Sequence, residues 1–131
     1  MALSATYEQN ILKHILGVAS LTMPTTVYVA LFTTTPTMPA GTGGVEVSGG
    51  AYARQAITFG VTGSGPAAAN NSGTITFPTA SASWGVITGA GLYDALTGGT
   101  LIDAGNLAAS KTIGSGDVFA IQPSNYTLSL T

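Results

Sequence analysis

The stretch Val27-Tyr28-Val29-Ala30-Leu31-Phe32 is the most apolar run of the chain, and it decides the fold class. Both alternating faces of this run are apolar, which is typical of a strand inside a sheet that is covered on both sides. Six apolar residues are also far fewer than the roughly 20 that a bilayer-spanning helix needs. The sequence therefore predicts a central strand over residues 25–34, and it predicts no membrane as a partner.

The rest of the chain is built of short segments rich in Val, Ile, Thr, Tyr and Phe, separated by clusters of Gly, Pro, Asn and Ser. Such spacing is typical of an all-β sandwich or barrel. We expect the further strands at 51–62, 73–78, 85–94, 99–107, 117–122 and 125–131, the last with Tyr126, Leu128 and Leu130 on one face. The prediction is a mainly β chain that forms an antiparallel, jelly-roll-like β-sandwich of about seven to eight strands, in a single domain over residues 1–131.

The connections between these strands fall into two classes. The breaks at 35–50 and 63–73 are rich in Gly and Pro, and breaks of this length in a compact domain are usually functional or mobile. Tight turns are expected at Thr97-Gly98-Gly99 and at Gly114-Ser115-Gly116-Asp117, because Gly adopts positive φ readily. Both turns connect predicted strands.

An amphipathic helix is expected near the N-terminus, over residues 5–16. Its apolar side chains recur at three- and four-residue spacings and are Leu3, Tyr7, Ile11, Leu12, Ile15 and Leu16. Ser4 is a suitable N-cap, and Gly17 is a suitable residue to end the helix. A helix this short is marginal alone in water, so we expect it to lie on another apolar surface.

The composition excludes several classes of function. Only 6% of the residues are charged, against roughly 25% in an ordinary domain, while Thr, Ser and Gly make up more than a third of the chain. Three basic residues and a net charge of −2 exclude nucleic-acid binding that depends on phosphate neutralisation. The absence of Cys removes disulfides, thiolate nucleophiles and Cys-ligated zinc. A hydrophobic content of 45% argues against disorder.

The few residues with chemical potential form no convincing site. His14 is the one histidine, without an evident nucleophile or second ligand nearby, so we interpret it as a surface or interface residue. Asp94 and Asp103 flank the predicted Gly98-Gly99 hairpin, and a carboxylate pair can serve glycoside hydrolysis. The simpler interpretation is that Asp94 ends a strand through an Asx-type turn and that Asp103 is a solvated strand residue.

Trp84 admits two interpretations, a sugar-stacking platform or a core or intersubunit anchor, of which the second is the more common role of a single Trp. Catalysis needs nucleophiles, metals or groups with shifted pKa values, and the sequence supplies almost none. We therefore predict no catalytic, cofactor-binding or metal-ligating residue, and a structural or binding role instead of an enzyme.

Four local motifs resemble a family of small tailed-bacteriophage virion proteins, often described as tail-fibre proteins. The motifs are Val27-Tyr28-Val29-Ala30-Leu31-Phe32-Thr33-Thr34-Thr35-Pro36, Glu46-Val47-Ser48-Gly49-Gly50-Ala51-Tyr52-Ala53-Arg54-Gln55, Ile75-Thr76-Phe77-Pro78-Thr79-Ala80 running to Trp84-Gly85, and Gly91-Leu92-Tyr93-Asp94. The resemblance covers nearly the whole chain and implies a virion component, assembled in the host cytoplasm, with no catalytic residues.

The resemblance suggests a homotrimeric capsid cement or decoration protein that clamps the major capsid protein, with contacts through the helix 5–16 and the loop 35–50. We expect the contact side chains to be Leu3, Tyr7, Ile11, Trp84 and Tyr93. The main alternative is a tail adaptor or fibre-associated protein that contacts other tail proteins. A carbohydrate-binding module that uses Trp84 and Asp94 is a weaker alternative.

Overall fold

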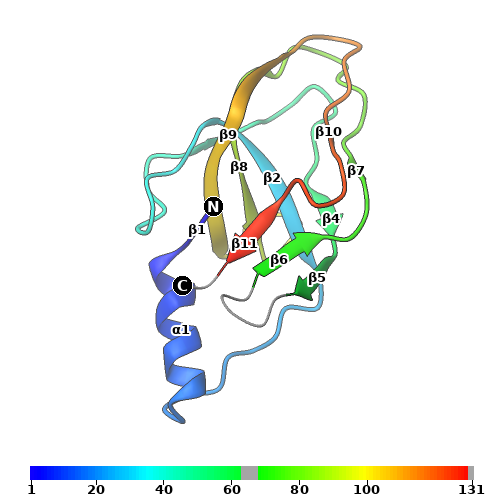
Figure 1. Ribbon diagram of the computed structural model, residues 1–131. Helices are drawn as coiled ribbons and strands as arrows, with labels where there is room; N and C mark the ends of the chain where they lie inside the picture. Colours follow the sequence, from blue (N-terminus) through cyan, green and yellow to red (C-terminus); the bar gives the residue numbers. More distant parts are fainter. Residues whose placement is uncertain (63–67, 130–131) are drawn as a thin grey trace.

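The computed structural model describes residues 1–62 and 68–129, and its main sheet is built around the apolar run quoted above. That run forms β2 (Val27–Thr34), which pairs with β8 on one side and with β3 and β4 on the other (Figure 1). All pairings are antiparallel. The other strands of this sheet are β1 (Ala2–Leu3), β3 (Val45–Glu46), β4 (Gln55–Ile57), β8 (Gly85–Tyr93) and β9 (Leu101–Ile113).

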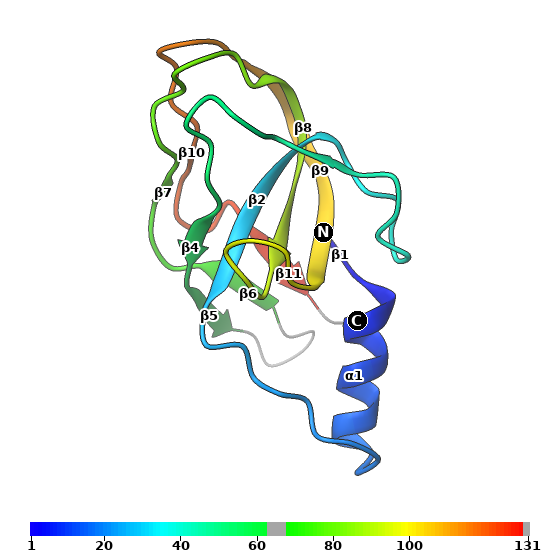
Figure 2. The same ribbon diagram turned by 180° about the vertical axis from the view of Figure 1, so that it is seen from behind.

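Short strands in two smaller sheets lie across one face of the main sheet. One sheet has the order β11-β6-β5, and the other pairs β10 with β7. Figures 1 and 2 show these strands on the same side of β2, β8 and β9 from the two opposite views. The strands are β5 (Phe59–Thr62), β6 (Ala68–Asn71), β7 (Ile75–Thr76), β10 (Ala120–Ile121) and β11 (Thr127–Ser129). The predicted mainly β, sandwich-like fold is confirmed.

Burial on both faces of β2 confirms its central position. Val29 and Leu31 belong to the large cluster of buried side chains between the layers, whereas Ala30 and Phe32 pack on the opposite face with Ala104. All four of these β2 side chains are at most 1% exposed. A run that is apolar on both faces therefore forms the middle of the fold, as expected from burial of apolar surface.

The described residues hold eleven strands, most of them short, instead of seven or eight. The predicted strand 51–62 divides at Thr58, because β4 pairs with β2 in the main sheet while β5 pairs with β6 in the opposite layer. One alternating segment thus crosses between layers. Three further strands, β1, β3 and β6, were not predicted, since two of them have only two residues and β6 lies in the Gly- and Pro-rich break.

The tight turn at Gly114-Ser115-Gly116-Asp117 is confirmed, because the Asp117 N–H donates to the Gly114 carbonyl at 3.0 Å and the Asp117 side chain accepts from the Gly114 N–H at 2.8 Å. Gly98 and Gly99 have the expected positive φ of +62° and +74°, but they lie in a longer reversal that the Asp94 N–H closes on the Thr100 carbonyl at 3.3 Å. Residues 63–67 of the predicted break and Leu130 of the last predicted strand lie outside the described residues.

The N-terminal helix α1 (Ala5–Ile15) is also confirmed, and it is fixed to the sheets by its first turn. Ser4 is the N-cap, and Gly17 follows the helix with φ of +74°. The Ser4 N–H donates to the Ile102 carbonyl and the Ala5 N–H to the Pro39 carbonyl, both at 2.8 Å. Within the described part of the chain, no helix is long and apolar enough to cross a membrane.

Ser4→Ala should lower the free energy of unfolding by about 1–2 kcal/mol. The buried Ser4 hydroxyl accepts from the Tyr7 N–H at 3.3 Å and donates to the Leu101 carbonyl at 2.6 Å, so its loss removes both the helix cap and a link to β9. Urea denaturation measures the loss. Ser110→Ala, at an exposed position of β9, is the matched control. Equal stability of both variants would show that the cap contributes nothing.

Candidate functional site

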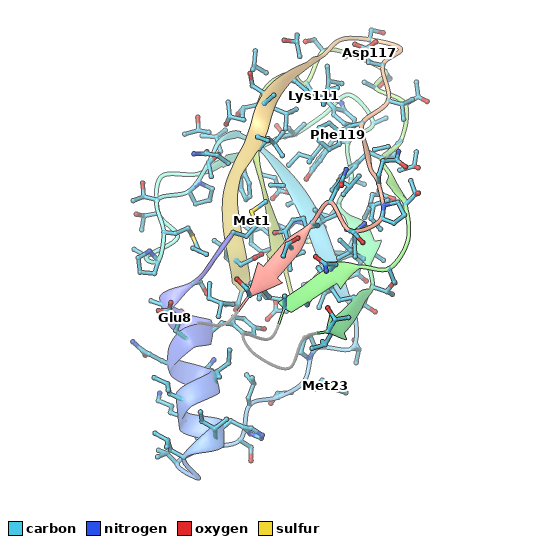
Figure 3. All side chains as sticks on the ribbon, in the orientation of Figure 1. Met1, Glu8, Met23, Lys111, Asp117 and Phe119 are labelled. Carbon is cyan, nitrogen blue, oxygen red and sulfur yellow. The ribbon has the colours of Figure 1, made fainter. Side chains whose placement is uncertain are left out.

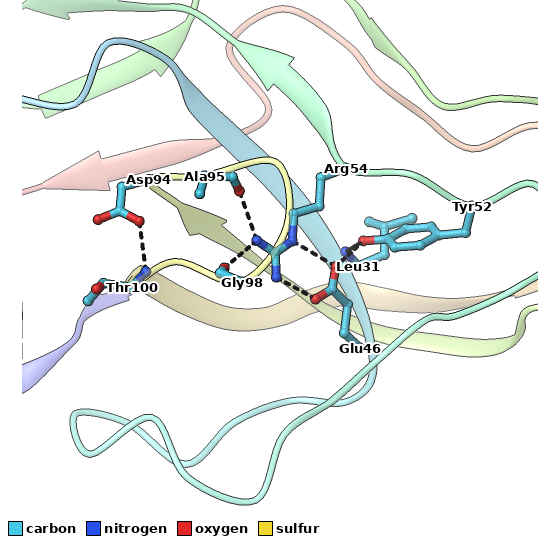
Figure 4. Close-up of polar contacts among 8 residues, drawn as sticks. All are labelled: Leu31, Glu46, Tyr52, Arg54, Asp94, Ala95, Gly98 and Thr100. Carbon is cyan, nitrogen blue, oxygen red and sulfur yellow. Dashed lines mark hydrogen bonds and ion pairs between the residues drawn. The ribbon is translucent and has the colours of Figure 1, made fainter.

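A polar cluster joins β3, the segment before β4 and the turn after β8, and we call it the Arg54 cluster (Glu46, Tyr52, Arg54 and Tyr93). A turn after β3 folds the chain back on itself, with Ala51 at φ +67° and the Tyr52 N–H bonded to the Gly49 carbonyl at 3.0 Å. This reversal places Glu46 and Arg54 side by side (Figure 4).

Arg54 is the centre of the cluster. Its Nε and Nη2 donate to the two carboxylate oxygens of Glu46 at 2.9 and 2.8 Å, in a bidentate ion pair. Its Nη1 donates to the carbonyls of Ala95 and Gly98, each at 2.8 Å. The guanidinium carbon lies 3.7 Å from the centre of the Tyr93 ring, a cation–π contact. One side chain thus fixes the turn after β8 to β3 and to the segment before β4.

Tyr52 completes the cluster by pairing with the backbone of β2. The Leu31 N–H donates to the Tyr52 hydroxyl at 3.0 Å, and this hydroxyl donates to Glu46 Oε2 at 2.9 Å. Along β2, β4 pairs with Val27, Tyr28 and Val29, and β3 with Phe32 and Thr34. The hydroxyl therefore satisfies a strand N–H at the point between the two short strands.

The environment of the cluster raises the pKa values of Tyr52, Arg54 and Tyr93, so that each of these three groups keeps its proton. Burial raises the pKa of Tyr52 well above its ordinary range. Burial opposes the charge of Arg54, but the hydrogen bonds and negative charge of Glu46 outweigh it and raise the pKa of Arg54. Burial also raises the pKa of Tyr93. Groups that keep their protons at every physiological pH do not exchange them with a substrate, so the arrangement fits a structural clamp.

Asp94 and Asp103 do not form a carboxylate pair. Asp94 accepts hydrogen bonds from the Thr100 N–H at 2.7 Å and from the Tyr7 hydroxyl at 3.0 Å, so it closes the turn and holds α1 to it. Burial and the Asp94 carboxylate raise the pKa of Tyr7 to about 12. The side chain of Asp94 closes the turn as expected of a strand-ending residue, but it bonds the N–H six residues further on instead of the one two residues further on that an Asx turn uses.

The prediction of a solvated Asp103 is wrong, because its side chain is 0% exposed. The Tyr126 hydroxyl donates to Asp103 Oδ1 at 2.7 Å, which links β9 to the segment before β11. Asp103 Oδ2 has no hydrogen-bond partner among the described residues. Burial raises the pKa of Asp103 to about 6, although the bond from Tyr126 partly offsets the effect. The carboxyl is a buried structural group.

The structure supports the core interpretation of Trp84. The indole is 5% exposed, its Nε1 donates to the Gly50 carbonyl at 2.8 Å, and its ring lies edge-on to Tyr52 at 5.5 Å between centres. A buried ring has no free face on which a sugar can stack, so a carbohydrate module based on Trp84 is not supported. Exposed His14 accepts from the Leu21 N–H at 3.1 Å through Nδ1, as expected of a surface residue.

The five side chains predicted to contact other subunits occupy different environments. Tyr7 and Trp84 are buried inside the chain, with 8% and 5% of their surfaces exposed, so they contribute to its own core. Leu3, Ile11 and Tyr93 are half-buried. Within residues 1–62 and 68–129, no group of three or more His, Asp or Glu side chains is placed to hold a metal ion.

The second half of α1 carries an exposed apolar surface. From the sequence we expected this helix to contact other subunits but did not name Leu12, Ile15 and Leu16 among the contact side chains, and these three are 54–71% exposed. The angle between residues around the helix axis could have shown this. At about 100° per residue, Leu16 lies opposite Tyr7 on the helix, so one buried face cannot hold both.

The comparison with family models agrees with the resemblance noted in the sequence. No curated protein matches the chain. A family model described as Podophage GP4 fiber I protein gp80 matches residues 2–129, nearly the entire length. This match covers the central strand, the Arg54 cluster and α1 alike. The chain therefore belongs to the podophage GP4 fiber I protein gp80 family, a family of structural proteins of the tailed-phage virion.

Proposed function

We propose that this chain is a non-catalytic, fibre-associated subunit of the phage tail, which assembles as a homotrimer and contacts other tail proteins. The observation that carries the proposal is the match to a fibre protein family over residues 2–129. The sequence alone favoured a capsid decoration protein. We place the chain at the tail because the family description names a fibre, and decoration of the head is the competing outcome.

The Arg54 cluster supports a structural role. Arg54 and Glu46 bond each other in a bidentate pair, and the remaining contacts of Arg54 go to the backbone of the turn after β8. An ion pair of this kind fixes loops against each other, because breaking it would leave a charge with little access to water.

The low charge of the surface supports association with protein partners. A net charge of −2, with few ionised side chains, means that few charges lose their water when two subunits come together. Exposed apolar side chains on α1 add surface that is more stable when buried. We infer that the partners are copies of this chain and neighbouring proteins of the tail.

Immunogold labelling of intact particles tests the location. Antibody against this chain should label the tail end of the particle, at one vertex, and particles that lack the gene should carry no label. Uniform label over the head would overturn the tail assignment in favour of decoration. Absence of the chain from purified particles would contradict any role in the virion.

A further inference from the structure

Exposed apolar side chains gather on the second half of α1 and the segment that follows it. We call this surface the α1 ridge (Ile15, Leu16 and Val18). These side chains are 67–71% exposed, among the most exposed large apolar residues that the structure describes. Figure 3 shows α1 extending away from the sheets, and exposed apolar surface of this kind is typical of a contact site.

The ridge lies far from the contacts that fix α1. Those contacts involve Ser4, Ala5 and Tyr7, all in or before the first turn of the helix. Near the end of α1, the Leu21 N–H bonds to His14 at 3.1 Å and holds the following segment against the helix. The ridge is therefore an ordered projection.

A groove runs beside the first half of the same helix. It has a volume of about 500 Å³ and lies between α1 and β1, with Leu3, Ile11 and Leu12 among its apolar lining. Glu8 also lines this groove, in the first turn of α1, while Lys13 lies in the last turn near the ridge. The end of α1 thus carries the apolar ridge with the cation Lys13 beside it. The first half of α1 borders an apolar groove that the anion Glu8 lines.

We propose that the α1 ridge of one copy of this chain occupies the α1 groove of the next copy, and that this head-to-tail contact closes the homotrimer. A second copy fits better than a foreign partner, because ridge and groove match in apolar character and Lys13 of one copy complements Glu8 of its neighbour. A contact between two different patches of the same chain generates a closed ring when its rotation allows. The number of copies rests on the proposed function.

Analytical ultracentrifugation of Ile15→Gln/Leu16→Gln tests the contact. Gln keeps a high helix propensity while it removes the apolar ridge, and it leaves the groove unchanged. The wild-type chain should sediment as a trimer of about 39 kDa, three times 13.0 kDa, at micromolar concentration, and the double variant as a monomer. Val61→Gln, on β5 at 74% exposure, is the matched control and should stay trimeric. A trimeric double variant with a wild-type circular dichroism spectrum would overturn the proposal.

Charge-reversal variants test whether the partner of the α1 ridge is a second copy of this chain or a different protein. Glu8→Lys and Lys13→Glu should each weaken self-association, by about two- to five-fold per contact, and the combined variant should recover most of the loss. The two residues are five positions apart on α1, so they are not neighbours within one helix. Failure of the combined variant to recover would contradict the pairing between copies.

The outcomes also separate this contact from the location in the virion. If the wild-type chain sediments as a monomer but the antibody labels the tail, the ridge contact is wrong and the tail assignment stands. If the chain forms a trimer that depends on the ridge but the antibody labels the whole head, the ridge contact stands and the tail assignment is wrong.

Discussion

Arg54→Ala should lower the free energy of unfolding by about 3–5 kcal/mol. The substitution leaves the Glu46 carboxylate without its bidentate partner, although its side chain is only 25% exposed. It also removes the donor to the Ala95 and Gly98 carbonyls and the contact with the Tyr93 ring. The midpoint of urea denaturation measures this loss of stability.

Two variants control for charge and for position. Arg54→Lys keeps the charge but not the bidentate geometry, so its stability should fall between those of the wild type and Arg54→Ala. Lys111→Ala removes an exposed cation from β9 and should change the free energy of unfolding by about 0.5 kcal/mol or less. If Arg54→Ala were as stable as Lys111→Ala, the cluster would not be the clamp described above.

The stability of the wild-type chain should fall as pH rises from 4 to 6, because of Asp103. Burial raises its pKa from 3.8 to about 6, so the folded chain binds a proton in a range where the unfolded chain has released it. The contribution is fully present below pH 4 and lost above pH 6. A shift of this size corresponds to about 3 kcal/mol. Urea denaturation at several pH values measures it.

Asp103→Asn isolates this contribution. The Asn side chain can still accept the hydrogen bond from Tyr126 but does not titrate, so the fall in stability between pH 4 and 6 should largely disappear. Asp117→Asn, at an exposed turn position, should leave the wild-type pH dependence in place. The prediction would be contradicted if the free energy of unfolding of the wild type did not fall between pH 4 and 6 and if Asp103→Asn showed the same pH dependence. That result would show that Asp103 ionises in the folded chain at its ordinary pKa.

The elements with strong local signals were predictable from the sequence. Residues 27–32 are apolar on both faces, and they form the buried centre of the sheet. The ends of α1 were also predictable, because a Ser side chain caps a helix N-terminus and Gly adopts the positive φ that ends a helix. Both preferences act within a few residues of Ser4 and Gly17. The division of 51–62 at Thr58 was not predictable, since alternation shows which faces are apolar but not which layer each half joins.

The Arg54 cluster and the buried Asp103 depend on contacts between residues far apart in the chain. Arg54 meets Gly98 across 44 positions, and Asp103 meets Tyr126 across 23. A charged residue in an alternating strand is usually solvated, so nothing local distinguished Asp103 from an exposed position. The side chains of the α1 ridge were not named as contacts for another reason: the apolar positions of the helix were assigned to one stripe, whereas they cover two faces.

A cryo-electron microscopy reconstruction of the intact tail tests most directly the claim that this chain is a structural subunit of the fibre apparatus. We expect density for the sandwich at the fibre, in three copies, with α1 of each copy against its neighbour. Density for the chain on the capsid shell, or a complete tail that contains none of it, would show that the chain is not a fibre subunit.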